Sequence, residues 1–254
     1  MAIACAKYVK KGCFELGGSD PFLVLKDANM EQAVNAAYAS RMGNSGQTCV
    51  SAKRFIITAP VYDEFKERLL EKIKTATVVG DPMDPATTLG PLAAPIQKER
   101  MLEQVTRAET EGGAKRLIGD FNWKISDPAL QDGNFVDTFV LEGLNSDSPV
   151  YSEEFFGPVF NIWKVESSQD AINLANKSDF GLASTVFTED YEKADYVAEH
   201  LRTGMVFVND MVIAGSEYPT GGIKGSGYGR ESYTDGLLEM TNRKTIVRRN
   251  NPQQ

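Results

Sequence analysis

The sequence is poor in the residues that build metal sites and disulfide frameworks. Its 254 residues include one histidine, His200, and three cysteines, Cys5, Cys13 and Cys49, with no C-x-x-C pair. One histidine all but excludes a site of several histidines around a metal, and an odd, scattered set of cysteines disfavours disulfides and structural zinc. We therefore predict no metal site and a reducing, cytoplasmic compartment.

Basic residues and long apolar stretches are also scarce. Lys and Arg number 27 against 35 Asp and Glu, so the net charge is −8. This balance disfavours nucleic acid or an anionic membrane as a partner. No apolar run approaches the roughly 20 residues of a membrane-spanning helix. The opening, residues 1–11, has too short an apolar core for a signal peptide.

Strand-like and helix-like segments alternate along most of the chain. Apolar runs predict strands at 13–16, 22–25, 54–58, 135–141, 160–165, 184–187 and 205–208, and a further short strand is expected at 115–118. Apolar spacing of the helical kind predicts a helix at 30–42, capped by Asp27. A polar helix is expected at 97–111, ended by Gly112-Gly113, and further helices at 169–176, 191–201 and 233–240. This alternation predicts an α/β fold whose sheet is largely parallel and flanked by helices.

Residues 44–53 (Asn-Ser-Gly-Gln-Thr-Cys-Val-Ser-Ala-Lys) place Cys49 in a small, polar turn that contains glycine. Such a turn leaves a thiol accessible and surrounds it with backbone N–H donors. An enzyme that forms a thioester needs both features, because the donors stabilise the oxyanion that forms when sulfur attacks a carbonyl. Taken alone, the same pattern also describes a small cysteine in an ordinary loop.

A carboxylate precedes two glycines upstream, in Phe-Glu-Leu-Gly-Gly at residues 14–18. The glycines allow a tight turn and the close approach of another group, and Glu15 is suited to act as a general base. The alternative is a glutamate at the end of a strand. His200 lies in an ordinary amphipathic helix, so the base that activates Cys49 must be another residue, consistent with Glu15.

Together, these two motifs resemble those of the aldehyde dehydrogenase superfamily. Glu-Leu-Gly-Gly at 15–18 is followed by Gly-Gln-Thr-Cys at 46–49. Further matches follow in the family's order at 80–82, 90–92, 153–159, 176–182 and 221–231. The resemblance covers essentially the whole chain. It implies an aldehyde dehydrogenase catalytic domain that oxidises an aldehyde with NAD or NADP.

The resemblance also implies roles for individual residues. Cys49 matches the nucleophile, whose thiohemiacetal passes a hydride to the nicotinamide and leaves a thioester. Glu15 matches the base that activates water for hydrolysis of that thioester. Glu154 and Phe156 match positions that hold the nicotinamide riboside, and Leu16 matches a residue whose backbone lies near the nicotinamide.

Within the superfamily, the chain is most similar to bacterial succinate-semialdehyde dehydrogenases. The similarity rests on residues 15–22, Arg41 and residues 52–56. A substrate with a distal carboxylate needs a cation, and arginine pairs with carboxylates through two hydrogen bonds. Arg41 lies ahead of the reactive turn and is the predicted substrate-binding residue. The alternative is a solvated arginine on a helix face.

The resemblance begins only near the end of the family's cofactor-binding domain. It implies a remnant of that domain at 1–16, a catalytic domain at 17–225, and a C-terminal helix and oligomerisation strand within 226–254. The strand, at 245–249, is expected to pair with another subunit in a homo-oligomer. Two hypotheses follow. The chain is the catalytic half of a succinate-semialdehyde-type dehydrogenase, or it is a truncated homologue without that activity, acting as an interaction module or pseudoenzyme.

Overall fold

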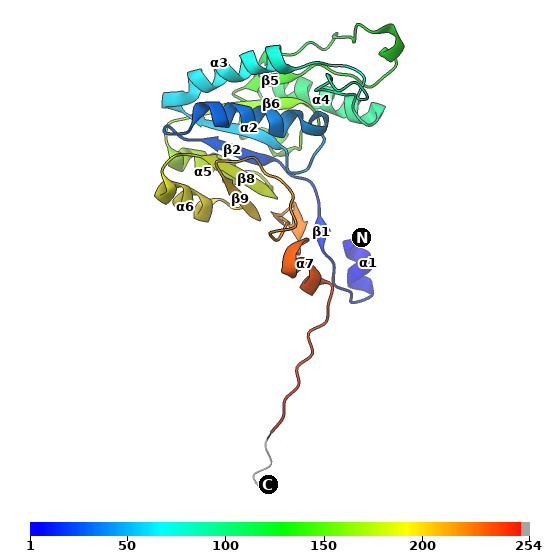
Figure 1. Ribbon diagram of the computed structural model, residues 1–254, viewed down its shortest axis with the longest axis vertical. Helices are drawn as coiled ribbons and strands as arrows, with labels where there is room; N and C mark the ends of the chain where they lie inside the picture. Colours follow the sequence, from blue (N-terminus) through cyan, green and yellow to red (C-terminus); the bar gives the residue numbers. More distant parts are fainter. Residues whose placement is uncertain (250–254) are drawn as a thin grey trace.

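A seven-stranded sheet forms the centre of the molecule (Figure 1). The computed structural model describes residues 1–249. The strand order is β4-β5-β6-β3-β2-β8-β9, and every neighbouring pair is parallel except β4 with β5. The bounds are β2 Asp20–Val24, β3 Ala52–Thr58, β4 Lys115–Ile118, β5 Phe139–Glu142, β6 Val159–Val165, β8 Ala183–Phe187 and β9 Met205–Val208. The predicted largely parallel α/β fold is confirmed.

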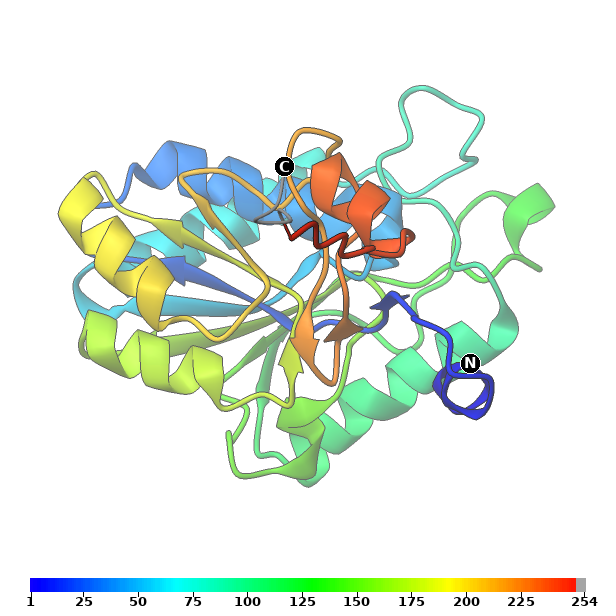
Figure 2. The ribbon, with the colours of Figure 1, turned by 90° about the horizontal axis from the view of Figure 1, so that it is seen from below.

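Helices cover both faces of this sheet, as the view from below shows (Figure 2). The helices α2 Met30–Met42 and α3 Ala59–Ala76 pack on one face, and α4 Pro95–Thr110, α5 Ser168–Asn176 and α6 Tyr191–His200 pack on the other. Successive residues of a strand point to opposite faces. Phe22 and Val24 of β2 therefore join the α2–α3 core, whereas Leu23 joins the other.

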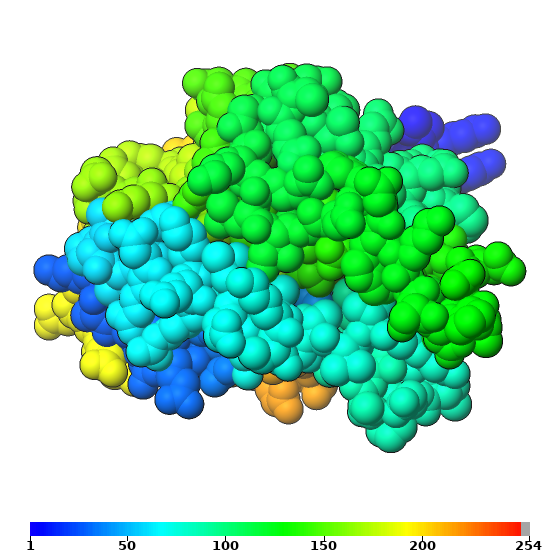
Figure 3. Space-filling model, turned by 90° about the horizontal axis from the view of Figure 1, so that it is seen from above, coloured from blue at the N-terminus to red at the C-terminus, as the bar shows by residue number. Residues whose placement is uncertain are grey.

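The outer end of the molecule is formed by α3 and the chain between α4 and β5 (Figure 3). Three short helical turns interrupt the loops within residues 1–249: η1 Gly43–Gly46, η2 Pro128–Leu130 and η3 Pro149–Ser152. The described part of the chain contains no helix with the length and apolar character that a membrane crossing requires.

Residues 14–15 and 223–239, which lie near the two ends of the described chain, come together at the opposite end of the molecule (Figure 1). Strand β1 Phe14–Glu15 pairs with β11 Gly227–Tyr228, and β7 Phe180–Gly181 pairs with β10 Ile223–Lys224. The short helices α1 Ala2–Lys7 and α7 Tyr233–Glu239 flank these strands and bury none of their residues.

Two local predictions are wrong. The cap of α2 is Asn29, whose side chain accepts a hydrogen bond from the Gln32 N–H group. Asp27 is not the cap because its carboxylate binds Thr188 at 2.8 Å and Lys193 at 3.4 Å. Strand β5 begins at Phe139 rather than at residue 135.

A further prediction concerns residues 245–249, which form no strand within this chain. The side chains of Ile246 and Val247 are 74% and 76% exposed. A strand is defined by its hydrogen-bonded neighbour, and the neighbour expected for this segment lies on another subunit. That pairing stays a prediction.

Candidate active site

The candidate site lies where the central parallel strands begin. Cys49 precedes β3, Glu154 precedes β6, and Glu15 lies shortly before β2. Parallel strands run in one direction, so the segments that enter them meet at one edge of the sheet. Residues far apart in the sequence are thereby brought together.

The reactive turn that carries Cys49 has an unusual backbone. Asn44, Ser45 and Gly46 all adopt positive φ, at 51°, 56° and 74°. A Cβ atom on Gly46 would lie 2.3 Å from the carbonyl oxygen of Gly157, so the position requires glycine. Ser45 donates a hydrogen bond to the Gly90 carbonyl at 3.0 Å, which ties the turn to the following loop.

Arg41 supports this turn from inside the protein. Its side chain is completely buried, and its guanidinium donates to the carbonyls of Gly46 and, at 3.0 Å, Ala52. Burial lowers the pKa of Arg41 to about 9. These contacts give Arg41 a place in the support of the turn. The contact between Arg41 and a substrate carboxylate stays a prediction. The complete burial of the guanidinium does not favour that contact.

Cys49 and Glu15 lie within hydrogen-bonding distance of each other. The Cys49 Sγ atom is 3.5 Å from Glu15 Oε2, and the thiol donates. Burial and the neighbouring carboxylate raise the pKa of Cys49 to about 11. Burial also raises the pKa of Glu15. The proton therefore rests on sulfur at neutral pH, with a carboxylate beside it that is able to accept that proton.

Glu154 packs against the Gly-Gly pair at residues 17–18 and contacts α4. Its Oε1 atom accepts a hydrogen bond from the Gly18 N–H group at 3.0 Å, and its carbonyl accepts one from Gln104 at 3.1 Å. A Cβ atom on Gly17 would lie 2.6 Å from Glu154 Oε2. The Gly-Gly pair thus allows the carboxylate to pack directly against the backbone.

Phe156 and Glu154 line the same pocket, of about 380 Å³. Its other walls come from α4, through Gln97, Arg100, Met101 and Gln104. Leu16, by contrast, is 51% exposed, and its N–H group donates to the Ser226 carbonyl at 3.1 Å. A pocket with a carboxylate and an aromatic ring fits a riboside and its attached ring, because the carboxylate accepts hydrogen bonds from hydroxyls.

Three buried charges at this edge of the sheet were not predicted: Lys53, Asp20 and Arg54, which is 2% exposed and donates to the Ser19 carbonyl at 2.8 Å. Lys53 is 0% exposed, and Asp20 is 2% exposed. Burial lowers the pKa of Lys53 to about 8 and raises the pKa of Asp20 to about 7. The sequence carried one signal for them: Asp20, Lys53 and Arg54 each stand at or near the start of a strand that is otherwise mainly apolar. A charged residue in such a place is rarely buried without a partner.

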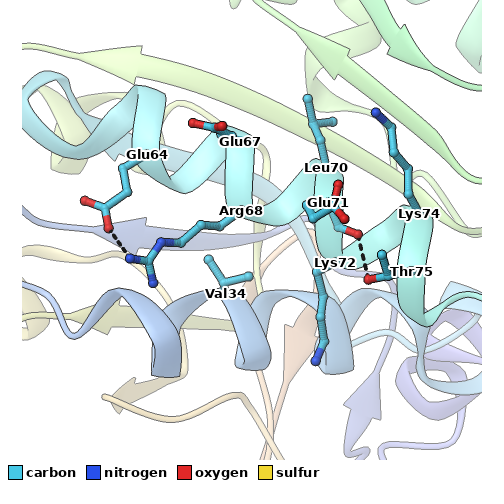
Figure 4. Close-up of a pocket in the computed structure, with 9 residues that line it drawn as sticks. All are labelled: Val34, Glu64, Glu67, Arg68, Leu70, Glu71, Lys72, Lys74 and Thr75. Carbon is cyan, nitrogen blue, oxygen red and sulfur yellow. Dashed lines mark hydrogen bonds and ion pairs between the residues drawn. The ribbon is translucent and has the colours of Figure 1, made fainter.

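A second hollow, of about 900 Å³, lies between α2 and α3 and is lined mainly by charged side chains (Figure 4). Arg68 pairs with Glu64 at 2.7 Å, and Thr75 donates to the Glu71 carbonyl at 2.8 Å. These contacts join residues one helical turn apart on α3, which is typical of a solvated helix face. Within residues 1–249, no group of three or more His, Cys, Asp or Glu side chains is placed to hold a metal ion.

Comparisons with known proteins show the family of this chain. Residues 1–246 match the family described as "Aldehyde dehydrogenase family". A succinate-semialdehyde dehydrogenase [NADP(+)] of Deinococcus radiodurans is 39% identical over 246 residues, covering 97% of this chain and 50% of the relative. One from Mycobacterium leprae is 39% identical over 238 residues, covering 94% and 50%. The chain thus spans about half the length of the curated relatives it matches.

Solved structures show the same fold. The succinic semialdehyde dehydrogenase of Streptococcus pyogenes, in complex with NADP+, superposes with a TM-score of 0.91 at 42% identity, covering 98% of this chain and 53% of that one. A betaine aldehyde dehydrogenase of Staphylococcus aureus, in complex with NAD+, gives 0.92 at 32% identity, covering 100% and 51%. With a match over residues 1–246, the chain belongs to the aldehyde dehydrogenase family.

Proposed function

We propose that this chain carries the catalytic half of an NAD(P)-dependent aldehyde dehydrogenase that oxidises succinic semialdehyde to the carboxylic acid. The observation that carries the proposal is the 3.5 Å contact between Glu15 Oε2 and the Sγ atom of Cys49, which lies in the reactive turn after Gly46. An accessible thiol with an adjacent base is the arrangement that covalent catalysis by cysteine requires.

The reaction begins with transfer of the Cys49 proton to Glu15. The thiolate then adds to the aldehyde carbon and forms a thiohemiacetal. Among the described residues, the Cys49 N–H group has no hydrogen-bond acceptor, so it is free to donate to the oxyanion.

Glu154, Phe156 and Leu16 would hold the nicotinamide riboside beside Cys49. Glu154 would accept hydrogen bonds from the ribose hydroxyls, Phe156 would pack against the ring, and the Leu16 backbone would border it. The nicotinamide, when bound, accepts the hydride that leaves the thiohemiacetal carbon. A thioester on Cys49 remains. Glu15 releases the proton it took from Cys49 to solvent, and its carboxylate then takes a proton from the water that hydrolyses the thioester.

The proposed substrate and cofactor rest on the relatives. Two of them are named succinate-semialdehyde dehydrogenase [NADP(+)], and the Streptococcus pyogenes structure contains NADP+. The Staphylococcus aureus structure contains NAD+, so we propose NAD or NADP for this chain. Arg41 remains the proposed carboxylate-binding residue. Because its guanidinium is buried, this role requires that the residues around it move apart when substrate binds.

The assembly and location belong to the same proposal. Residues 1–16 are the end of a cofactor-binding domain, 17–225 the catalytic domain and 226–254 the C-terminal helix and oligomerisation segment. We propose a homo-oligomer joined through residues 245–249, and a cytoplasmic location. The alternative of an inactive truncated homologue is not favoured, because Cys49 and Glu15 are both present and in contact.

Two assays test the proposal. The first follows the absorbance of reduced nicotinamide with succinic semialdehyde and NAD or NADP, with Cys49→Ala as the control. The second follows p-nitrophenolate release from p-nitrophenyl acetate, which needs the thiol and the base but no dinucleotide. We expect a burst of p-nitrophenolate that Cys49→Ala abolishes. Equal rates for the unmodified chain and Cys49→Ala in both assays would refute the proposal.

A further inference from the structure

Lys53 occupies a central position between the reactive turn and Glu154. Its Nζ atom donates to the carbonyls of Thr48 at 2.8 Å and Cys49 at 2.5 Å. The same atom lies 3.5 Å from Glu154 Oε1. An ammonium group has three donors and no acceptor, so these three oxygens match its capacity.

These contacts close a ring around the site. Glu154 Oε1, which faces Lys53, also accepts the hydrogen bond from the Gly18 N–H group. Gly18 in turn packs against the turn so closely that a Cβ atom there would lie 2.7 Å from the Cys49 carbonyl oxygen. Lys53 therefore joins the carbonyl of the proposed nucleophile to the proposed riboside carboxylate.

The charges that face Lys53 come from four parts of the chain. Asp20 on β2 and Glu154 before β6 favour its charged form, and so does Cys49, whereas Arg41 on α2 opposes it. Burial is the largest influence and lowers its pKa to about 8. Lys53 is therefore mainly an ammonium ion at neutral pH. Facing Cys49 itself are Glu15, which raises the thiol pKa, and Lys53, which lowers it.

We infer that Lys53 is a positioning residue that fixes the reactive turn relative to Glu154 and supplies positive charge beside Cys49. The inference rests on the proposed function, since it takes Cys49 as the nucleophile and Glu154 as the riboside ligand. The side chain does not itself reach the reacting atoms. It acts through the main chain of Thr48 and Cys49 and through Glu154.

The test for the charge is the pH dependence of Cys49 alkylation by iodoacetamide, read by peptide mass spectrometry on the purified chain. In Lys53→Met the loss of the ammonium raises the thiol pKa, so the profile moves to higher pH. One pKa unit lowers the thiolate population tenfold and raises its nucleophilicity about threefold, so the rate falls about threefold near neutral pH. Lys53→Arg restores part of the rate.

The chain supplies its own controls. Cys5 reports on the reagent in the same sample, and Lys26→Met removes an exposed lysine just after the far end of β2. A folded Lys53→Met with an unchanged profile would overturn the charge role. Lys53→Gln keeps a donor for the carbonyls and repeats the test if the Met variant does not fold. If neither neutral variant folds, Lys53 serves folding alone and the inference fails.

A double-mutant cycle tests the connection to Glu154. Thermal denaturation midpoints are compared for Lys53→Met, Glu154→Gln and the double variant. Residues that interact directly give non-additive effects, so the double variant should lose less than the sum of the single losses. Additive losses would overturn the connection. Neither test uses an aldehyde or a dinucleotide, so the inference and the proposed function can fail separately.

Discussion

Replacing Glu15 with glutamine should make Cys49 more reactive toward a simple alkylating agent and at the same time abolish thioester chemistry. The carboxylate accepts the thiol hydrogen bond at 3.5 Å, and it is among the causes that raise the pKa of Cys49. Glutamine keeps the size and removes the negative charge. The thiolate is then less disfavoured, but no base remains to accept its proton or to activate water.

The size of the effect follows from the distance. Both side chains are partly exposed, so solvent screens the charge strongly. At 3.5 Å, two unit charges in a water-like dielectric interact by about 1 kcal/mol, which is about one pKa unit. The thiolate population rises about tenfold and its nucleophilicity falls about threefold, so alkylation near neutral pH should accelerate about threefold.

The assay measures the rate of Cys49 alkylation by iodoacetamide over a range of pH, beside the p-nitrophenolate burst. Glu189→Gln is the matched control, because it removes an exposed carboxylate just beyond the far end of β8. We expect the Glu15→Gln profile to move to lower pH while the steady release of p-nitrophenolate is lost. A profile that stays in place or moves to higher pH would refute the electrostatic argument.

Three further predictions concern the turn, the sheet and the C-terminal segment. Gly46→Ala should lower the free energy of unfolding by about 2 kcal/mol or more, because alanine is strained at this positive φ and meets the Gly157 carbonyl. Gly43→Ala, with no atom within 4 Å of its new Cβ, is the control, and urea denaturation compares the two. Burial raises the pKa of Asp20 from 3.8 to about 7, so between these pH values the native state binds more protons and stability falls as pH rises. Asp20→Asn should remove this fall in stability. The free energy of unfolding, measured by urea denaturation across this pH range, would contradict the prediction if it had the same pH dependence in the wild-type chain and in Asp20→Asn. Ile246→Asp should shift the chain to a smaller species in size-exclusion chromatography, and an unchanged elution volume would contradict pairing through this segment.

Local patterns in the sequence determined the elements of the fold. The apolar spacing of residues 30–42 and the short apolar run at 205–208 predicted α2 and β9 with the bounds that the structure has. These features depend on neighbours along the chain, so periodicity alone identifies them. The motifs around Glu15 and Cys49 likewise pointed to the two residues that the structure brings into contact.

The tertiary structure decided which charges are buried and what each one contacts. Nothing in the local pattern around Arg41 distinguishes a solvated helix face from the enclosed guanidinium that supports the reactive turn. Lys53 and Asp20 acquire their burial only when β2 and β3 pair and the segments before β6 and β8 close over them. Burial and pairing are properties of residues distant in sequence, so the electrostatics of the site emerge only when the strand ends meet at one edge of the sheet.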